Sequence, residues 1–224
     1  MECKLLFKVA TRHRPHLIIR LLENFFANVS CPKHTMLLLS LDLDDSTMCN
    51  KQMLDRLSVI SKNNNLMFFI DKSKSKVDAL NRDIDKIKFD WDAIINITEY
   101  CDMLKGFDDA IRSLEKLGYG RLKNKIVYVN SNNTNGKKHK KLYIMGKNIY
   151  KVRGYMYNPK FYGTLYKDEL LNVCSNIYTS AVKKDVFNYR HSDWFYYATD
   201  TITKNKFKHW QSDLETLENL INES

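Results

Sequence analysis

Short apolar runs alternate with stretches of helical periodicity through the first hundred residues. The runs at 4–10, 34–43, 66–70 and 91–98 are rich in Leu, Ile, Phe and Val and have the length of buried β-strands. The stretches at 14–29, 51–62 and 75–87 carry apolar residues three and four positions apart, as amphipathic helices do. Because strands and helices alternate, we predict an α/β fold with a doubly wound, mostly parallel sheet and helices on both faces.

Charged residues follow three of the predicted strands. In sheets of this kind, ligands bind beyond the carboxyl ends of the strands. The residues at these ends are Thr11, Arg12 and Arg14, then Asp42, Asp44 and Asp45, then Glu99 and Asp102. Neither G-x-G-x-x-G nor G-x-x-x-x-G-K-[ST] occurs, so we expect a metal ion and cationic side chains, not a glycine-rich loop, to hold any phosphate.

Length and cysteine usage indicate one domain in a reducing compartment. The 224 residues suffice for a single core, and the five cysteines form no C-x-x-C pair. We therefore predict neither a disulfide framework nor a zinc cluster. No run of about 18 apolar residues occurs, so we expect no membrane span and a cytoplasmic location.

Positive charge is concentrated in the second half of the chain. Residues 1–120 hold 18 Lys and Arg against 17 Asp and Glu, whereas residues 121–210 hold 18 against 5. Residues 211–224 carry four acids and no base, with leucines at helical spacing. We divide the domain into three parts. They are a first half of nearly balanced charge (1–120), a basic second half (121–210) and an acidic C-terminal helix (211–224). The basic half is suited to a polyanionic partner, or it serves solubility.

Four motifs, taken in order, resemble a known enzyme family. They are V-A-T-R-H-R-P (9–15), L-S-L-D-L-D-D (39–45), K-S-K-V-D-A-L-N (74–81) and D-A-I-I-N-I-T-E-Y-C-D-M-L-K-G-F-D-D-A-I (92–111). The chain is similar to family-two glycosyltransferases of the GT-A fold, most of all to a small subgroup in phages and other microbes. This resemblance implies transfer of a sugar from a nucleotide diphosphate, here a UDP-sugar, to a hydroxyl acceptor. It further implies dependence on Mn²⁺ or Mg²⁺, and we expect inversion at the sugar carbon.

The metal position departs from the family pattern. The subgroup closes its fourth strand with S-D-D-M, whereas this chain has Y-C-D-M, which keeps Asp102 and places Cys101 at the first carboxylate. A neutral thiol is a poor ligand for Mg²⁺ or Mn²⁺. Three interpretations remain open: Asp102 suffices with water and diphosphate, Glu99 reaches in as a second ligand, or metal affinity is lost. By the same resemblance, His191 is a candidate late metal ligand, although a lone histidine is commonly a surface or packing residue.

The resemblance also assigns residues to the donor. It places Asp42 and Asp44 against the base and ribose, where carboxylates can accept hydrogen bonds from N–H and hydroxyl groups. The other candidate donor-binding residues are Thr11, Arg12, Arg14, Lys76 and Asn81. Two alternatives stay open: Asp45 or Ser46 of the same acidic cluster caps the following helix, and Lys76 is a solvated surface residue.

The general base and the acceptor site fall in the basic half. An inverting transfer needs a base to take the proton of the acceptor hydroxyl. Asp168, followed by Glu169, is the candidate because the family has an acidic pair there, although acids also favour the first turn of any helix. The segment 150–167 interleaves Lys and Arg with tyrosines, which suits either nucleic acid or sugar rings.

The acceptor therefore remains open between a modified DNA base, or another polyanion, and a cell-surface glycan. The alternative function is a catalytically degenerate nucleic-acid-binding protein with the GT-A fold.

Overall fold

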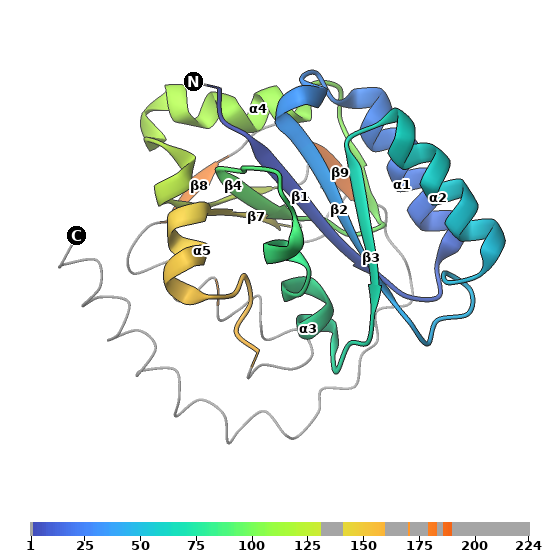
Figure 1. Cartoon of the computed structure of the whole chain (residues 1–224). Coiled ribbons are helices and arrows are strands. Elements are labelled where there is room, and N and C mark those ends of the chain that lie inside the picture. Colours follow the sequence, from blue (N-terminus) through green and yellow to red (C-terminus); the bar gives the residue numbers. More distant parts are fainter. Residues whose placement is uncertain (1, 131–140, 160–169, 171–178, 183–185, 190–224) are drawn as a thin grey trace.

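The computed structural model describes residues 2–130, 141–159, 170, 179–182 and 186–189. In this part of the chain, the main sheet has the strand order β3-β2-β1-β4-β7-β6-β8, and β5 pairs with β9 in a second, two-stranded sheet (Figure 1). The strands are β1 (Leu5–Thr11), β2 (Thr35–Asp42), β3 (Leu66–Asp71), β4 (Ala93–Asn96), β5 (Cys101–Met103), β6 (Ile126–Asn130), β7 (Lys141–Gly146), β8 (Thr179–Val182) and β9 (Phe187–Tyr189).

The strand directions confirm the predicted mostly parallel sheet. β1 is parallel to both β2 and β4, and β2 is parallel to β3. β7 runs antiparallel to β4 and β6, whereas β8 is parallel to β6. Among the described strands of this sheet, β7 alone is therefore reversed.

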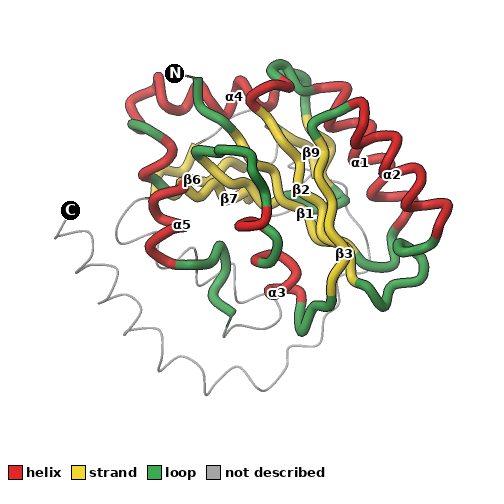
Figure 2. Tube along the Cα trace, viewed as in Figure 1, coloured by secondary structure: helices red, strands yellow, loops and turns green. Residues whose placement is uncertain are grey.

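Helices cover both faces of the sheet (Figure 2). The helices are α1 (Pro15–Asn28), α2 (Lys51–Asn63), α3 (Lys76–Asn81), α4 (Phe107–Leu114) and α5 (Lys147–Arg153), with shorter helical turns η1 (Pro32–His34), η2 (Ile84–Lys86), η3 (Glu115–Tyr119) and η4 (Leu122–Asn124). One core joins α1, α2 and α4 to strand residues such as Phe7, and the other joins α3 and α5 to residues such as Leu6. Successive residues of β1 thus point to opposite faces.

Three phenylalanines hold α4 against the first of these cores. The ring of Phe7 lies 5.0 Å from that of Phe25 and 5.2 Å from that of Phe107, both edge to face. α4 begins directly after Gly106, whose φ of 72° is one that glycine adopts without strain. α4 was not among the helices predicted from apolar periodicity.

Two predicted elements are shorter in the structure. The predicted helix 75–87 ends at Asn81, because Asp83 adopts a left-handed conformation with φ 71° and the turn η2 follows. The predicted strand 91–98 is reduced to β4, and Trp91 packs edge-on against Tyr150 at 5.4 Å. Within the described residues, we find no helix with the length and apolarity needed to cross a membrane. The acidic segment 211–224 lies outside these residues.

Candidate functional site

The carboxyl ends of β1, β2 and β3 lie side by side. In the parallel register, Thr11 is opposite Leu41, and the next residue of β2, Asp42, is opposite Asp71. The hydroxyl of Thr11 is buried and has no hydrogen-bond partner in the described part of the chain. The structure therefore brings Thr11 and Asp42 to one edge, and it leaves a buried polar atom there.

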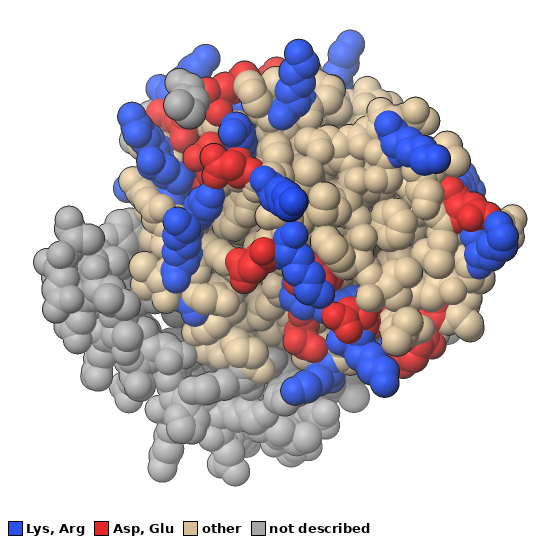
Figure 3. All heavy atoms as spheres, viewed as in Figure 1, with Lys and Arg blue, Asp and Glu red and all other residues tan. Residues whose placement is uncertain are grey.

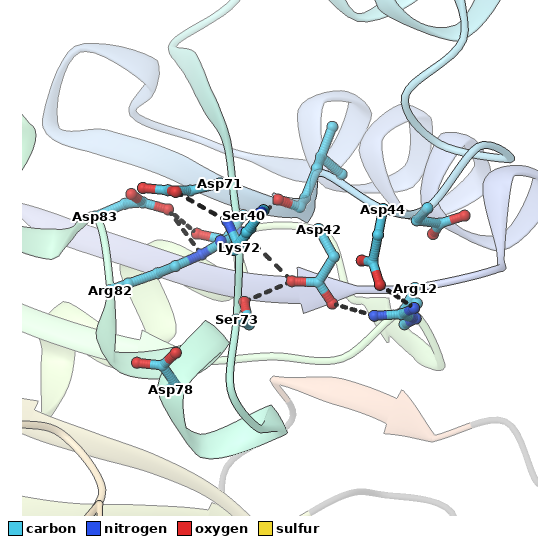
Figure 4. Close-up of polar contacts among 12 residues, drawn as sticks. Arg12, Ser40, Asp42, Asp44, Asp71, Lys72, Ser73, Asp78, Arg82 and Asp83 are labelled. Atoms are coloured by element: carbon cyan, nitrogen blue, oxygen red, sulfur yellow. Dashed lines mark hydrogen bonds and ion pairs between the residues drawn. The ribbon is translucent and has the colours of Figure 1, made fainter.

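Arg12 bridges the two carboxylates that follow β2 (Figure 4). Its Nη2 lies 2.8 Å from Oδ2 of Asp44, and its Nη1 lies 3.4 Å from Oδ2 of Asp42. The hydrogen bond from Arg12 lowers the pKa of Asp44. The Asp44 side chain is 65% exposed, whereas that of Asp42 is 12% exposed. Asp44 is therefore exposed to solvent, whereas Asp42 lies mostly inside the protein.

Arg82 approaches Asp42 from the opposite side, and the sequence analysis did not single it out. Its Nη2 donates to the carbonyl of Leu41 and lies 3.6 Å from Oδ1 of Asp42, which also accepts from the hydroxyl of Ser73 (Figure 4). The Arg82 side chain is 10% exposed, and its Nη1 is buried without a partner among the described residues. Arg82 follows the A-L-N sequence of a predicted helix, and nothing in this pattern predicts that its side chain is buried.

A second charged group joins the start of α1, the start of α3 and the segment after β4. Arg14 donates from Nη1 to Oε1 of Glu99, and its guanidinium lies 5.4 Å from the centre of the Tyr100 ring. Lys76 reaches solvent at the first position of α3. Desolvation by the surrounding protein lowers the pKa of Lys76, Glu99 raises it, and Arg14 lowers it. Arg14 therefore pairs with the buried carboxylate of Glu99, and the charge of Lys76 interacts with the same carboxylate, which is an arrangement suited to an anionic ligand.

Asn81 and Asp45 are engaged in structural contacts. Nδ2 of Asn81 donates to the carbonyl of Tyr157 at 2.6 Å, and its Oδ1 accepts from the backbone N–H of Met156 and Tyr157. Asp45 accepts from the backbone N–H of His13 at 2.7 Å.

The capping interpretation of the acidic cluster is wrong. The residue that caps α2 is Asn50, whose side chain accepts from the backbone N–H of Met53 at 3.0 Å. Asp45 instead binds the hydroxyl and backbone N–H of Thr47, in the loop between β2 and α2.

The described residues assemble only a fragment of the expected metal site. The Asp102 side chain is 24% exposed, and its Oδ2 lies 3.8 Å from Nη2 of Arg20. Cys101 is buried in the core, and Glu99 is paired with Arg14. No three metal-ligating side chains of the described residues meet at this edge. Asp168, Glu169 and His191 lie outside the described residues.

A buried polar network lies beside Asp42. Lys8, in the middle of β1, is fully buried and donates from Nζ to the hydroxyl of Ser40 and, at 3.0 Å, to the carbonyl of Arg82. The Ser40 hydroxyl donates to Oδ2 of Asp83. Desolvation lowers the pKa of Lys8 to about 7, although Asp83 opposes that shift. A buried lysine with a lowered pKa is therefore built into β1.

Comparison with solved structures identifies the fold. Residues 1–349 of S. aureus TarS, in complex with UDP-GlcNAc, superpose with a TM-score of 0.58 at 13% identity, over 85% of this chain and 60% of that TarS fragment. The mannosyltransferase PcManGT of Pyrobaculum calidifontis, in complex with GDP-Man and Mn²⁺, superposes with a TM-score of 0.61 at 9% identity, over 88% of this chain and 59% of that one. The chain thus spans less than two thirds of either protein.

A third structure, GalNAc-T7 with UDP, GalNAc and Mn²⁺, gives a TM-score of 0.55 at 10% identity, over 73% of this chain and 39% of that one. No protein-family model matches the sequence, and no relative is found among curated proteins. Identities this low establish architecture alone. The mixed α/β chain, with its mostly parallel sheet, has the GT-A-like fold that the sequence predicted.

Proposed function

We propose that this chain is a glycosyltransferase that moves a sugar from a UDP-sugar to a hydroxyl acceptor. The observation that carries the proposal is the convergence of Arg12, Asp42 and Asp44 with Arg14 and Lys76 at the carboxyl edge of the sheet. This is the edge at which open α/β sheets bind ligands. Solved structures with the same fold hold UDP, UDP-GlcNAc or GDP-Man, which supports a nucleotide-sugar ligand.

Each charged group has a role in this proposal. Asp42 and Asp44 accept hydrogen bonds from the base and the ribose. The Arg12–Asp44 pair is exposed and therefore screened by solvent, so a nucleotide can replace Arg12 at modest cost. Arg14 and Lys76 lie against the diphosphate and stabilise the charge that develops as it leaves. Asp168 is the proposed base that takes the acceptor proton, and Glu169 is the proposed neighbouring acid.

Metal dependence rests on Asp102 and His191. Of these, Asp102 alone lies in the described residues, where one carboxylate 3.8 Å from an arginine is an insufficient ligand set for Mg²⁺ or Mn²⁺. A bound divalent cation would neutralise the departing diphosphate.

The proposed acceptor is a modified DNA base or another polyanion, with a surface glycan as the alternative. The face drawn in Figure 3 carries positive and negative side chains intermixed among its described residues. A second candidate function is a nucleic-acid-binding protein that has lost catalysis. It is favoured by the burial of Cys101 at the expected position of a carboxylate.

Donor binding can be tested by melting the protein with UDP, GDP and their sugars, each with and without Mn²⁺. A ligand of the native state raises the melting temperature. We expect a shift with a uridine nucleotide, reduced in Asp44→Asn and retained in Asp55→Asn, an exposed carboxylate on α2 paired with Lys51. Absence of a shift with every nucleotide, combined with salt-sensitive DNA binding, would favour the second candidate.

A further inference from the structure

A second group of metal-ligating side chains lies at the opposite edge of the sheet. It consists of Glu2, just before β1, and Cys31 and His34, in the connection between α1 and β2. Near this edge, at the top of Figure 1, lie the amino ends of β1 and β2. The group is therefore separate from the candidate donor site, which lies beyond the carboxyl ends of the same strands.

The three ligand atoms are close enough to share one ion. Sγ of Cys31 lies 3.5 Å from Nδ1 of His34 and 3.9 Å from Oε2 of Glu2. Tetrahedral zinc with bonds of about 2.0–2.3 Å separates its ligands by roughly 3.5 Å, so these two distances already fit. Nδ1 of His34 and Oε2 of Glu2 are 2.7 Å apart and share a hydrogen bond. Zinc would replace this bond after a movement of under about 1 Å.

A buried ion pair fixes the backbone of both loop ligands. Oδ2 of Asp108 accepts from the backbone N–H of Cys31 at 2.9 Å, and Oδ1 accepts from that of Ser30 at 2.8 Å. Arg112 donates to the carbonyl of His34 at 3.1 Å and pairs with Asp108 at 2.8 Å. Asp108 and Arg112 are both at least nine-tenths buried. The C-x-x-H turn is thus held in place before any ligand binds, which lowers the entropy cost of binding.

We propose that Glu2, Cys31 and His34 bind one zinc ion, with water in the fourth position. Cysteine, histidine and carboxylate are the ligands of protein zinc sites. A thiolate and a carboxylate together balance the charge of Zn²⁺, and neutral His34 binds through Nδ1. The Cys31 thiol releases its proton to solvent on binding, so affinity rises with pH. The ion links the N-terminal segment to the loop that precedes β2.

Cobalt provides the direct test, because Co²⁺ occupies zinc sites and absorbs strongly when bound by thiolate. We expect titration of the reduced full chain to give this absorption at one equivalent. Cys31→Ser and His34→Ala should abolish it, and Cys49→Ser and His16→Ala should retain it. Loss of a residue that hydrogen-bonds to a metal ligand weakens metal binding about 10- to 100-fold. Glu2→Gln removes a ligand itself, so we expect it to weaken Co²⁺ binding by at least this factor. Absence of the absorption in the wild type, or its persistence in Cys31→Ser, would overturn the proposal.

Thermal melting supplies the second readout. Zn²⁺ should raise the melting temperature of the wild type relative to a chelator, and Cys31→Ser should remove this shift. Melting in the chelator shows whether each variant folds. Asp102→Ala should retain the zinc shift, since Asp102 belongs to the other edge of the sheet. A shift lost in Asp102→Ala and kept in Cys31→Ser would assign the zinc to that edge instead.

Discussion

Arg14 donates from Nη1 to Oε1 of Glu99 across 85 residues of sequence, and this ion pair joins the start of α1 to the segment after β4. The Glu99 side chain is 4% exposed, whereas that of Arg14 is 32% exposed. A buried carboxylate therefore orients a cation that still reaches solvent. Such a cation can bind an anionic ligand without first being ordered.

Arg14→Ala should affect both donor binding and folding. Removing the guanidinium takes a cation from the proposed diphosphate site, and we expect at least tenfold weaker nucleotide binding, or about 1.4 kcal/mol. The substitution also removes the ion pair between Arg14 and the buried Glu99. This loss should lower the free energy of unfolding by about 1–3 kcal/mol. Calorimetric titration with nucleotide and denaturant unfolding measure the two effects.

The double variant Arg14→Ala/Glu99→Gln separates them. Neutralising the buried carboxylate should recover part of the lost stability, because the buried charge that has lost its ion pair with Arg14 is then removed. Nucleotide binding should stay weak. Recovery of both properties together would mean that Arg14 acts only through the fold.

Asn81 is expected to matter for stability. Its amide makes three hydrogen bonds to the backbone of Met156 and Tyr157, 75 and 76 residues away. Asn81→Ala removes these three hydrogen bonds and should cost about 3 kcal/mol of unfolding free energy, at roughly 1 kcal/mol for each. Urea unfolding measures the loss. A neutral effect on stability with lost nucleotide binding would restore the donor-contact assignment.

The sequence predicted best those features that depend on residues close together along the chain. Apolar periodicity located β1 to β4 and α1 to α3, and the position of Arg12 and Asp42 after strands predicted their convergence. Arg82 was missed because its partner Asp42 comes from a distant segment, and the Glu2, Cys31 and His34 group was missed because Glu2 lies far along the chain from the other two. The break at Asp83 was missed because no glycine marks its positive φ. Burial and long-range contact are tertiary properties that spacing alone does not encode.

Cys101→Asp tests whether restoring the family carboxylate restores a metal site. The Cys101 side chain belongs to the apolar core and is 1% exposed. An aspartate there would be buried among apolar groups, so we expect a loss of several kcal/mol of stability and no gain in Mn²⁺ affinity. Differential scanning calorimetry with and without Mn²⁺ tests both. Asp102→Asn, at a partly exposed position, should change stability by under about 1 kcal/mol and reduce any Mn²⁺-dependent shift.

Lys8 should make stability depend on pH in a direction opposite to that of an ordinary paired lysine. Burial lowers its folded pKa to about 7 from 10.5. Between these values, the unfolded chain keeps the Lys8 proton that the folded chain has lost, so raising the pH favours the folded state. The slope is about 1.4 kcal/mol per pH unit for one proton, and it vanishes below pH 7, where both states are protonated.

Urea unfolding between pH 7 and 9 measures this slope, and Lys8→Met should remove it. The upper limit avoids Cys3, whose pKa is raised from 9.0 to about 12 by burial and whose contribution has the opposite sign. Lys62→Met, an exposed position in the last turn of α2, is the matched control and should keep the wild-type slope. An equal slope in Lys8→Met and the wild type would show that Lys8 remains charged within the sheet, held by Asp83 through Ser40.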